Sequence, residues 1–201
     1  MSTRRSPRSF AARRRSVAEV AAETERLILR TWELADRSEY ARHVNTPEVG
    51  RHVGGVQSDE ELTAAFERLE GYHRDTGHTF WAVERKGDGV LLGFCGLKLA
   101  NVPGTPVHGE VEIGWRLRAD AWGQGYAKEA AQASLDWAWA NLDCDRVVSF
   151  TIPANEASWG LMERLGMTRR PDLDFAHPHF APDHPLSQHI TYAIERPRVN
   201  P

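Results

Sequence analysis

The feature that most constrains this chain is a glycine-bearing stretch that links an expected strand to an expected long helix. It reads Arg118-Ala119-Asp120-Ala121-Trp122-Gly123-Gln124-Gly125-Tyr126-Ala127. Such a loop offers backbone N–H groups to a ligand, and the positive dipole end of the following helix adds to them. The stretch therefore predicts a pyrophosphate-binding site.

Length and composition favour one domain around this loop. The chain has 201 residues, 41% hydrophobic and 26% charged, which is ordinary for a globular protein. No apolar run approaches the roughly 18 residues of a membrane span. We expect a single domain over residues 23–197, preceded by a disordered or loosely packed extension over residues 1–22. Cys95 and Cys144 lie far apart without metal-type spacing, so we expect buried thiols and a cytoplasmic protein.

The extension carries a charge opposite to that of the rest of the chain. Its residues 1–18 contain six arginines and no acidic residue: Arg4, Arg5, Arg8, Arg13, Arg14 and Arg15. Without these six, the 25 basic residues fall to 19 against 28 acidic ones. This acidic body argues against a nucleic-acid-binding domain. We interpret the arginine segment as an unpacked extension, and contact with RNA or a ribosome is the alternative.

Hydrophobic periodicity predicts an alternation of strands and helices around the loop. The expected strands cover residues 26–30, 79–84, 90–97, 110–117 and 146–152, with two more between 167 and 194. The expected helices cover residues 58–69, 127–142 and 155–165, with a polar helix ending before Pro47. Residues 48–57 and 101–107 are expected to form loops at the substrate rim, and Gly114 is a candidate β-bulge. The strand, loop, helix, strand and helix from residue 110 onward predict an α/β fold with a mixed sheet.

Four motifs around the loop resemble a known family. The loop lacks the G-x-G-x-x-G pattern of dinucleotide sites, and Lys128 is followed by Glu129 rather than by the Ser or Thr of a P-loop. The run Trp122-Gly-Gln-Gly-Tyr-Ala-Lys-Glu-Ala130, with Glu112-Ile-Gly-Trp115, Asn155-Glu-Ala-Ser158 and Glu163-Arg-Leu-Gly-Met167, resembles the GNAT N-acetyltransferase superfamily. The match is closest to its ribosomal-protein N-terminal acetyltransferase (RimJ/RimL-type) branch and covers about residues 25–195.

This resemblance implies a fold and a cofactor site. The fold would be a mixed, mostly antiparallel sheet of six or seven strands, flanked by helices and splayed between the fourth and fifth strands, with acetyl-coenzyme A in the splay. The loop residues Trp122, Gly123, Gln124, Gly125, Tyr126 and Ala127 would bind the pyrophosphate. Backbone groups of Trp115 and Leu117 would pair with the pantetheine arm. Asn155 would contact that arm, and capping of the following helix is its alternative role. A homodimer is a further expectation from the family.

Acetyl transfer to an amine requires a group that removes a proton from the ammonium. Glu110 and Glu112 would face the same side of a regular strand. Glu112 matches the Glu-Ile-Gly motif and is the favoured base over Glu110, with a salt bridge or a solvated strand face as the alternative for both.

The leaving thiolate requires a proton or a hydrogen bond. Many relatives carry a tyrosine where this chain has Met162, and a thioether cannot donate a proton. Ser158 is the remaining candidate, because it matches a serine of the ribosomal-type branch. Packing on the inner face of the helix is its alternative role.

The histidines at positions 177, 179, 184 and 189 raise the question of a metal. Prolines interrupt the segment and no fixed ligand spacing recurs, so we expect no metal and a role in packing or at the substrate rim.

The sequence thus predicts an acetyltransferase that moves acetyl from acetyl-coenzyme A to a primary amine by direct attack. The acceptor would be a protein N-terminus or a small-molecule amine. A coenzyme A-binding sensor or interaction module without chemistry is the alternative, motivated by Met162.

Overall fold

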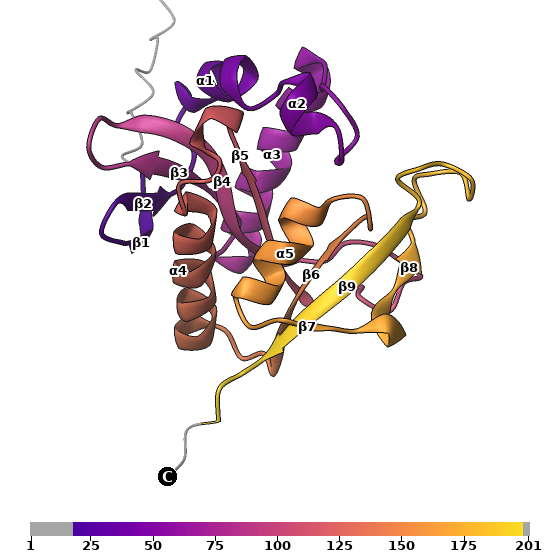
Figure 1. Cartoon of the computed structure of the whole chain (residues 1–201). Coiled ribbons are helices and arrows are strands. Elements are labelled where there is room, and N and C mark those ends of the chain that lie inside the picture. The colour runs from indigo at the N-terminus through magenta and orange to yellow at the C-terminus, as the bar shows by residue number, and fades with distance from the viewer. Residues whose placement is uncertain (1–17, 199–201) are drawn as a thin grey trace, which may run out of the picture.

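The computed structural model describes residues 18–198, whose centre is a twisted sheet with helices on both faces (Figure 1). Within these residues there are nine strands. Eight follow the order β1-β2-β3-β4-β5-β6-β9-β7, and the ninth, β8, pairs with β9 outside this order. Their bounds are β1 Val20–Glu23, β2 Leu27–Arg30, β3 Phe80–Arg85, β4 Val90–Leu99, β5 Val111–Leu117, β6 Arg146–Thr151, β7 Thr168–Arg169, β8 Phe175–Ala176 and β9 Gln188–Glu195. The pairing of β5 with β6 is parallel, and the other pairs are antiparallel.

The helix α4 (Tyr126–Asn141) connects β5 to β6 and covers one face of the sheet. Its inner stripe holds small side chains, among them Ala131, Ser134 and Ala138, which are buried. Small residues let the helix axis approach β4 and β5 closely, and Leu135 fills the remaining space. A 3₁₀ turn, η1 (Ala119–Ala121), leads into the glycine loop at its start.

The opposite face carries α1 (Asp36–His43), the short α2 (Pro47–Gly50) and α3 (Asp59–Thr76). Their core includes Tyr40, Val44 and Leu62 against Ala82 of β3. Helix α3 begins with the capping box that its sequence predicts, because Ser58 accepts from the Glu61 N–H and the Glu61 carboxylate accepts from the Ser58 N–H. It ends at Gly77, whose φ of 79° closes the last turn.

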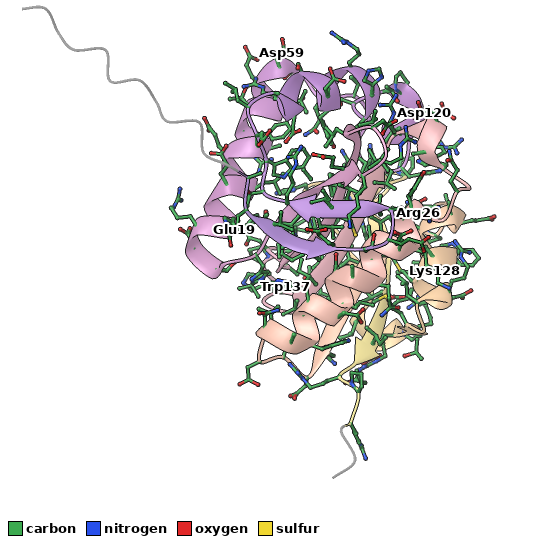
Figure 2. All side chains as sticks on the ribbon, turned by 90° about the vertical axis from the view of Figure 1, so that its left-hand side faces the viewer. Glu19, Arg26, Asp59, Asp120, Lys128 and Trp137 are labelled. Carbon is green, nitrogen blue, oxygen red and sulfur yellow. The ribbon has the colours of Figure 1, made fainter. Side chains whose placement is uncertain are left out.

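The β1–β2 hairpin fastens the start of α4 to the sheet. The Arg26 side chain forms an ion pair with Glu129 at 2.6 Å and donates to the Gln124 carbonyl at 3.0 Å. Figure 2 shows Arg26 at this hairpin beside the end of α4 that carries Lys128. The position of the glycine loop is therefore fixed by a turn that is distant from it in sequence.

The second half of the molecule consists of α5 (Glu156–Arg164), β6 and the strands that follow it. Strand β9 pairs with β6 along its length, and a second 3₁₀ turn, η2 (Pro171–Leu173), precedes β8. Met162 is fully buried in the core between α5 and α4. Its thioether is therefore a packing element of the core.

Several predictions from the sequence are corrected here. Residues 20–23 form β1 and pair with β2, so they are not part of the predicted extension, whose residues 1–17 lie outside the described range. The strand count exceeds six or seven because β1, β7 and β8 have only two to four residues, too few to give a periodic signal. The expected loop 48–57 begins within α2.

The predicted bulge is also at a different place. Pairing of β4 with β5 is regular through Gly114. The register shift lies instead in the pairing of β3 with β4, at Gly93 of β4. Gly114 instead leaves room for the Phe80 ring, which a Cβ atom would approach to 2.7 Å.

We predict that Gly93→Ala destabilises the protein by about 2 kcal/mol or more. The φ of 138° at this residue is strained for any L side chain, and a Cβ atom would lie 2.1 Å from the Arg116 carbonyl oxygen. Gly87→Ala is the matched control, because a Cβ there meets nothing within 4 Å. Chemical denaturation should leave that control within about 0.5 kcal/mol of the wild type. Equal stability of the two variants would contradict this account of β4.

Candidate active site

The candidate site begins where β5 and β6 separate. Their parallel pairing comprises Val111 with Val147 and Glu112 with Val148, and the strands then diverge. The Ala100 N–H donates to the Glu110 carbonyl, and the Arg118 N–H donates to Leu92, which fixes the even-numbered residues of β5 as partners of β4. The backbone groups of Ile113, Trp115 and Leu117 consequently point toward the splay.

A cavity of about 780 Å³, here called the loop cavity, occupies one end of this splay. It is lined by the end of β5, the glycine loop, the start of α4, the start of α5 and the segment 48–53. All residues of the predicted loop site except Gln124 line it: Trp122, Gly123, Gly125, Tyr126 and Ala127. The Gln124 side chain points elsewhere and donates to the Asp120 carbonyl at 2.8 Å.

The geometry of the loop suits a phosphate ligand. Gly123 and Gly125 have φ values of 73° and 82°, and no side chain caps the first turn of α4. The first N–H groups of a 16-residue helix therefore remain available for an anion. Arg51, Lys128 and Arg164 add positive charge to the lining. These side chains and backbone groups suit a ligand that carries phosphate groups.

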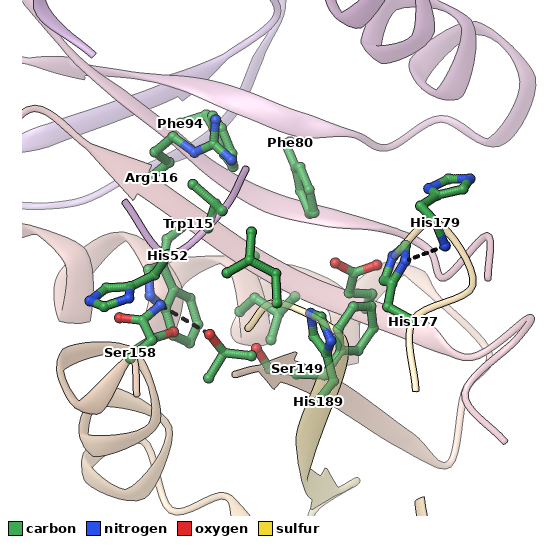
Figure 3. Close-up of a pocket in the computed structure, with 18 of the residues that line it drawn as sticks. His52, Phe80, Phe94, Trp115, Arg116, Ser149, Ser158, His177, His179 and His189 are labelled. Atoms are coloured by element: carbon green, nitrogen blue, oxygen red, sulfur yellow. Dashed lines mark hydrogen bonds between the residues drawn. The ribbon is translucent and has the colours of Figure 1, made fainter. Parts of the chain in front are cut away.

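A second cavity of about 390 Å³, here called the histidine cavity, continues from the first (Figure 3). Six residues line both cavities: His52, Val53, Trp115, Arg116, Asn155 and Ser158. Its far end is formed by Phe80, Phe150, Phe180 and three histidines, and Glu112 lies in its wall. Asn155 and Ser158 are therefore at the junction between a cationic cavity and an aromatic one.

Glu112 is the one predicted base that lines the histidine cavity. Its side chain is 12% exposed and forms a salt bridge with Lys98 of the neighbouring strand. Burial raises the pKa of Glu112 above its usual value, and the Lys98 ammonium opposes that rise. The pair leaves the carboxylate accessible from the cavity while keeping its charge compensated.

Glu110 is directed elsewhere. It lies just before β5, lines neither cavity and forms a salt bridge with Arg146 at 2.5 Å. Glu110 precedes the regular strand, which begins at Val111, and its carboxylate is engaged with Arg146 rather than with the cavity.

Asn155 does not cap α5 with its side chain. It occupies the N-cap position, but its Nδ2 donates to the Thr151 hydroxyl at 3.0 Å, a bond drawn in Figure 3. This bond ties the end of β6 to the start of α5 and leaves the side-chain oxygen of Asn155 without a partner within the described residues. Of the two roles considered, helix capping is excluded by this geometry.

Sequence reasoning missed several lining residues. Arg51, His52, Lys128 and Arg164 come from three separate segments, and the motifs and the rim loop that contain them gave these side chains no role. Conversely, the loop 101–107 lines neither cavity, because Val102 and Val107 are buried beneath β6 and β9. Among residues 18–198 no three His, Cys, Asp or Glu side chains are arranged to hold a metal ion, and no helix is long and apolar enough to cross a membrane. Cys95 is a buried thiol, and burial raises its pKa to about 12.

Comparison with known proteins identifies this arrangement. The model of the acetyltransferase (GNAT) domain matches residues 26–168, so the chain belongs to the GNAT acetyltransferase family. The predicted family, the mostly antiparallel fold and the acetyltransferase activity are thereby confirmed. Members of this family use acetyl-coenzyme A.

Individual relatives agree in sequence and fold. The uncharacterized N-acetyltransferase p20 of Bacillus licheniformis is 26% identical over 150 residues, 73% of this chain and 81% of that protein. An acetyltransferase from Agrobacterium tumefaciens has a TM-score of 0.70 at 28% identity, covering 95% of this chain and 99% of that one. RimL, a ribosomal L7/L12 alpha-N-protein acetyltransferase, shares the fold with a TM-score of 0.73 at 16% identity, over 93% of this chain and 99% of that one.

We predict that Lys98→Met makes stability depend on pH through Glu112. A carboxyl whose folded pKa is raised contributes stability at low pH and loses it as pH rises through that pKa. Removing the ammonium raises the Glu112 pKa further, so the loss relative to the wild type should be larger at pH 8, about 3 kcal/mol, than at pH 5.

Denaturation at both pH values measures this difference. The double variant Lys98→Met/Glu112→Gln is the control, because it removes the buried charge and should show no such dependence. The same deficit at pH 5 and pH 8 would contradict the assignment.

Proposed function

We propose that this acetyltransferase moves an acetyl group from acetyl-coenzyme A to a primary amine that binds in the histidine cavity. The observation that carries the proposal is the continuity of the two cavities, with Asn155 and Ser158 at their junction. One cavity offers backbone N–H groups and cations, and the other offers a carboxylate among aromatic rings. A phosphate-bearing donor and an amine acceptor would meet at that junction.

The loop residues and backbone of β5 would hold the donor. The N–H groups from Gly123 to Ala127 would bind the pyrophosphate, and the free backbone groups of Trp115 would pair with the pantetheine arm. The Leu117 carbonyl already accepts a hydrogen bond from the Trp122 indole at 2.9 Å, so its N–H is the group that would pair with the arm. Asn155 would hydrogen-bond the same arm through its side-chain oxygen.

Glu112 and Ser158 would handle the protons of the reaction. The Glu112 carboxylate, directly or through a water, would take the proton that the ammonium must lose before its nitrogen can attack. The Ser158 hydroxyl would donate a hydrogen bond to the departing sulfur. The half-buried Ser158 side chain has no hydrogen-bond partner in the described part of the chain, which leaves its proton available.

The aromatic lining favours an acceptor with an apolar group near its amine. Phe80 and Phe94 stack with centroids 5.1 Å apart, and Arg116 lies 5.7 Å from the Phe94 ring. A third cavity of about 240 Å³ continues past these residues toward Tyr40 and Phe66. A bulky acceptor would extend along this path.

The test is an acceptor screen at saturating acetyl-coenzyme A. We expect amine-dependent thiol release with at least one of spermidine, kanamycin, phenylalanine and a short peptide with a free N-terminus. Calorimetric titration of the same protein with coenzyme A measures donor binding separately. Tight binding without amine-dependent release would support the alternative, a non-catalytic coenzyme A-binding module.

We predict that Ser158→Ala lowers kcat by about tenfold or more and leaves coenzyme A affinity within about twofold, because a stabilising hydrogen bond in the transition state is lost. Ser38→Ala is the control, since this serine is exposed on α1 and lines neither cavity. Initial rates of thiol release measure the predicted fall in kcat. Unchanged turnover in Ser158→Ala would eliminate the role.

A further inference from the structure

His189 has surroundings that distinguish it from the other histidines. It lies at the start of β9, and its ring stacks on Phe175 at 5.2 Å with an interplanar angle of 12°. The Phe150 ring meets it edge-on at 5.9 Å. Figure 3 shows the His189 ring directed into the histidine cavity beside His177. Two aromatic contacts therefore hold the imidazole in one orientation.

The backbone fixes the tautomer of this ring. His189 Nδ1 lies 3.2 Å from the Ser187 carbonyl oxygen. A carbonyl oxygen can only accept, so Nδ1 must carry the proton. The other nitrogen, Nε2, then has a free lone pair in the neutral ring. His189 is thus a proton acceptor at Nε2.

His177 has the opposite arrangement. Its Nδ1 accepts from the His179 backbone N–H at 3.3 Å, which places its own proton on Nε2. The two rings are 5.2 Å apart between centroids. The cavity therefore offers one imidazole that accepts and one that donates.

Burial favours the neutral forms of both rings. Burial lowers the pKa of His189, and burial together with neighbouring His189, His179 and Lys98 lowers the pKa of His177 to about 4. The other titratable groups lining the cavity are His52, Glu112, Arg116 and His179. Both rings are consequently neutral near pH 7, when a proton acceptor is required.

Glu112 needs such a partner. Its side chain is largely shielded from solvent and engaged with Lys98, and burial favours its protonated form. A carboxyl that has taken a proton from the acceptor must lose it before the next turnover. The half-exposed His189 lines the same cavity and follows the largely exposed segment 178–185.

We propose that His189 is a second proton acceptor of this site and carries the proton of the acceptor ammonium from Glu112 to solvent. The Glu112 O–H bond breaks with its electron pair remaining on the carboxylate, and the proton crosses the cavity through a water molecule. An N–H bond then forms at Nε2 of His189, and the imidazolium releases the proton to solvent. This role rests on the proposed function. No oxidant or reductant is involved, and His177 takes no part in the transfer.

The tautomer can be tested without knowing the acceptor. Long-range ¹H–¹⁵N spectra of the wild-type protein, assigned with His189→Gln, should show a neutral ring protonated at Nδ1 that ionises below pH 6.5. A ring protonated at Nε2, or ionisation at or above pH 6.5, would overturn the proposal.

The kinetic test uses the amine from the acceptor screen that gives the fastest thiol release. His189→Gln should lower kcat/KM by about tenfold to a hundredfold. Activity of the wild type should fall as pH drops through the lowered pKa of His189, and that inflection should be missing in the variant. Added imidazole should restore part of the rate.

His184→Gln is the matched control, because His184 belongs to the same loop, stacks on Phe180 and lines neither cavity. It should retain wild-type activity. An active wild type with an equally active His189→Gln, or a deficit that is uniform in pH and insensitive to imidazole, overturns the role of His189 alone. Absence of amine-dependent thiol release in the wild type overturns the proposed function and the inference with it.

Discussion

Two pairs of residues, Val111 with Val147 and Glu112 with Val148, join β5 to β6 before the strands diverge. The divergence is stable because each strand is fully paired on its other side, β5 with β4 and β6 with β9. Unpaired backbone groups at a sheet interior normally cost free energy unless they find partners. Here they line a cavity, so the missing strand-to-strand bonds become sites for a ligand.

The elements around the splay follow from this constraint. Helix α4 must cross from the end of β5 to the start of β6, and the loop before it therefore opens at the mouth of the cavity. The Arg26–Glu129 pair holds that end of the helix against β1 and β2. Helix α5 begins where β6 ends, which brings Asn155 and Ser158 to the opposite wall. The loop cavity is therefore lined from both halves of the sheet.

Electrostatics distinguish the two cavities. The loop cavity combines a helix N-terminus with Arg51, Lys128 and Arg164, and it suits a polyanion. The histidine cavity holds a carboxylate paired with Lys98 and imidazoles whose pKa values are lowered by burial. Proton transfer in such surroundings depends on fixed tautomers as much as on pKa values, and the backbone carbonyl of Ser187 supplies one of them.

The sequence by itself determined the long elements, the capping box of α3, the glycine loop and the family. These features depend on residues that are close in sequence, so local sequence patterns predict them. Only the tertiary structure decided that Glu112 rather than Glu110 reaches the cavity, that Met162 belongs to the core, and that Asn155 bonds Thr151 instead of capping its helix. It also brought Lys98 to Glu112 and His177 to His189. Those relations depend on strand register and on packing between distant segments, which no local spacing encodes.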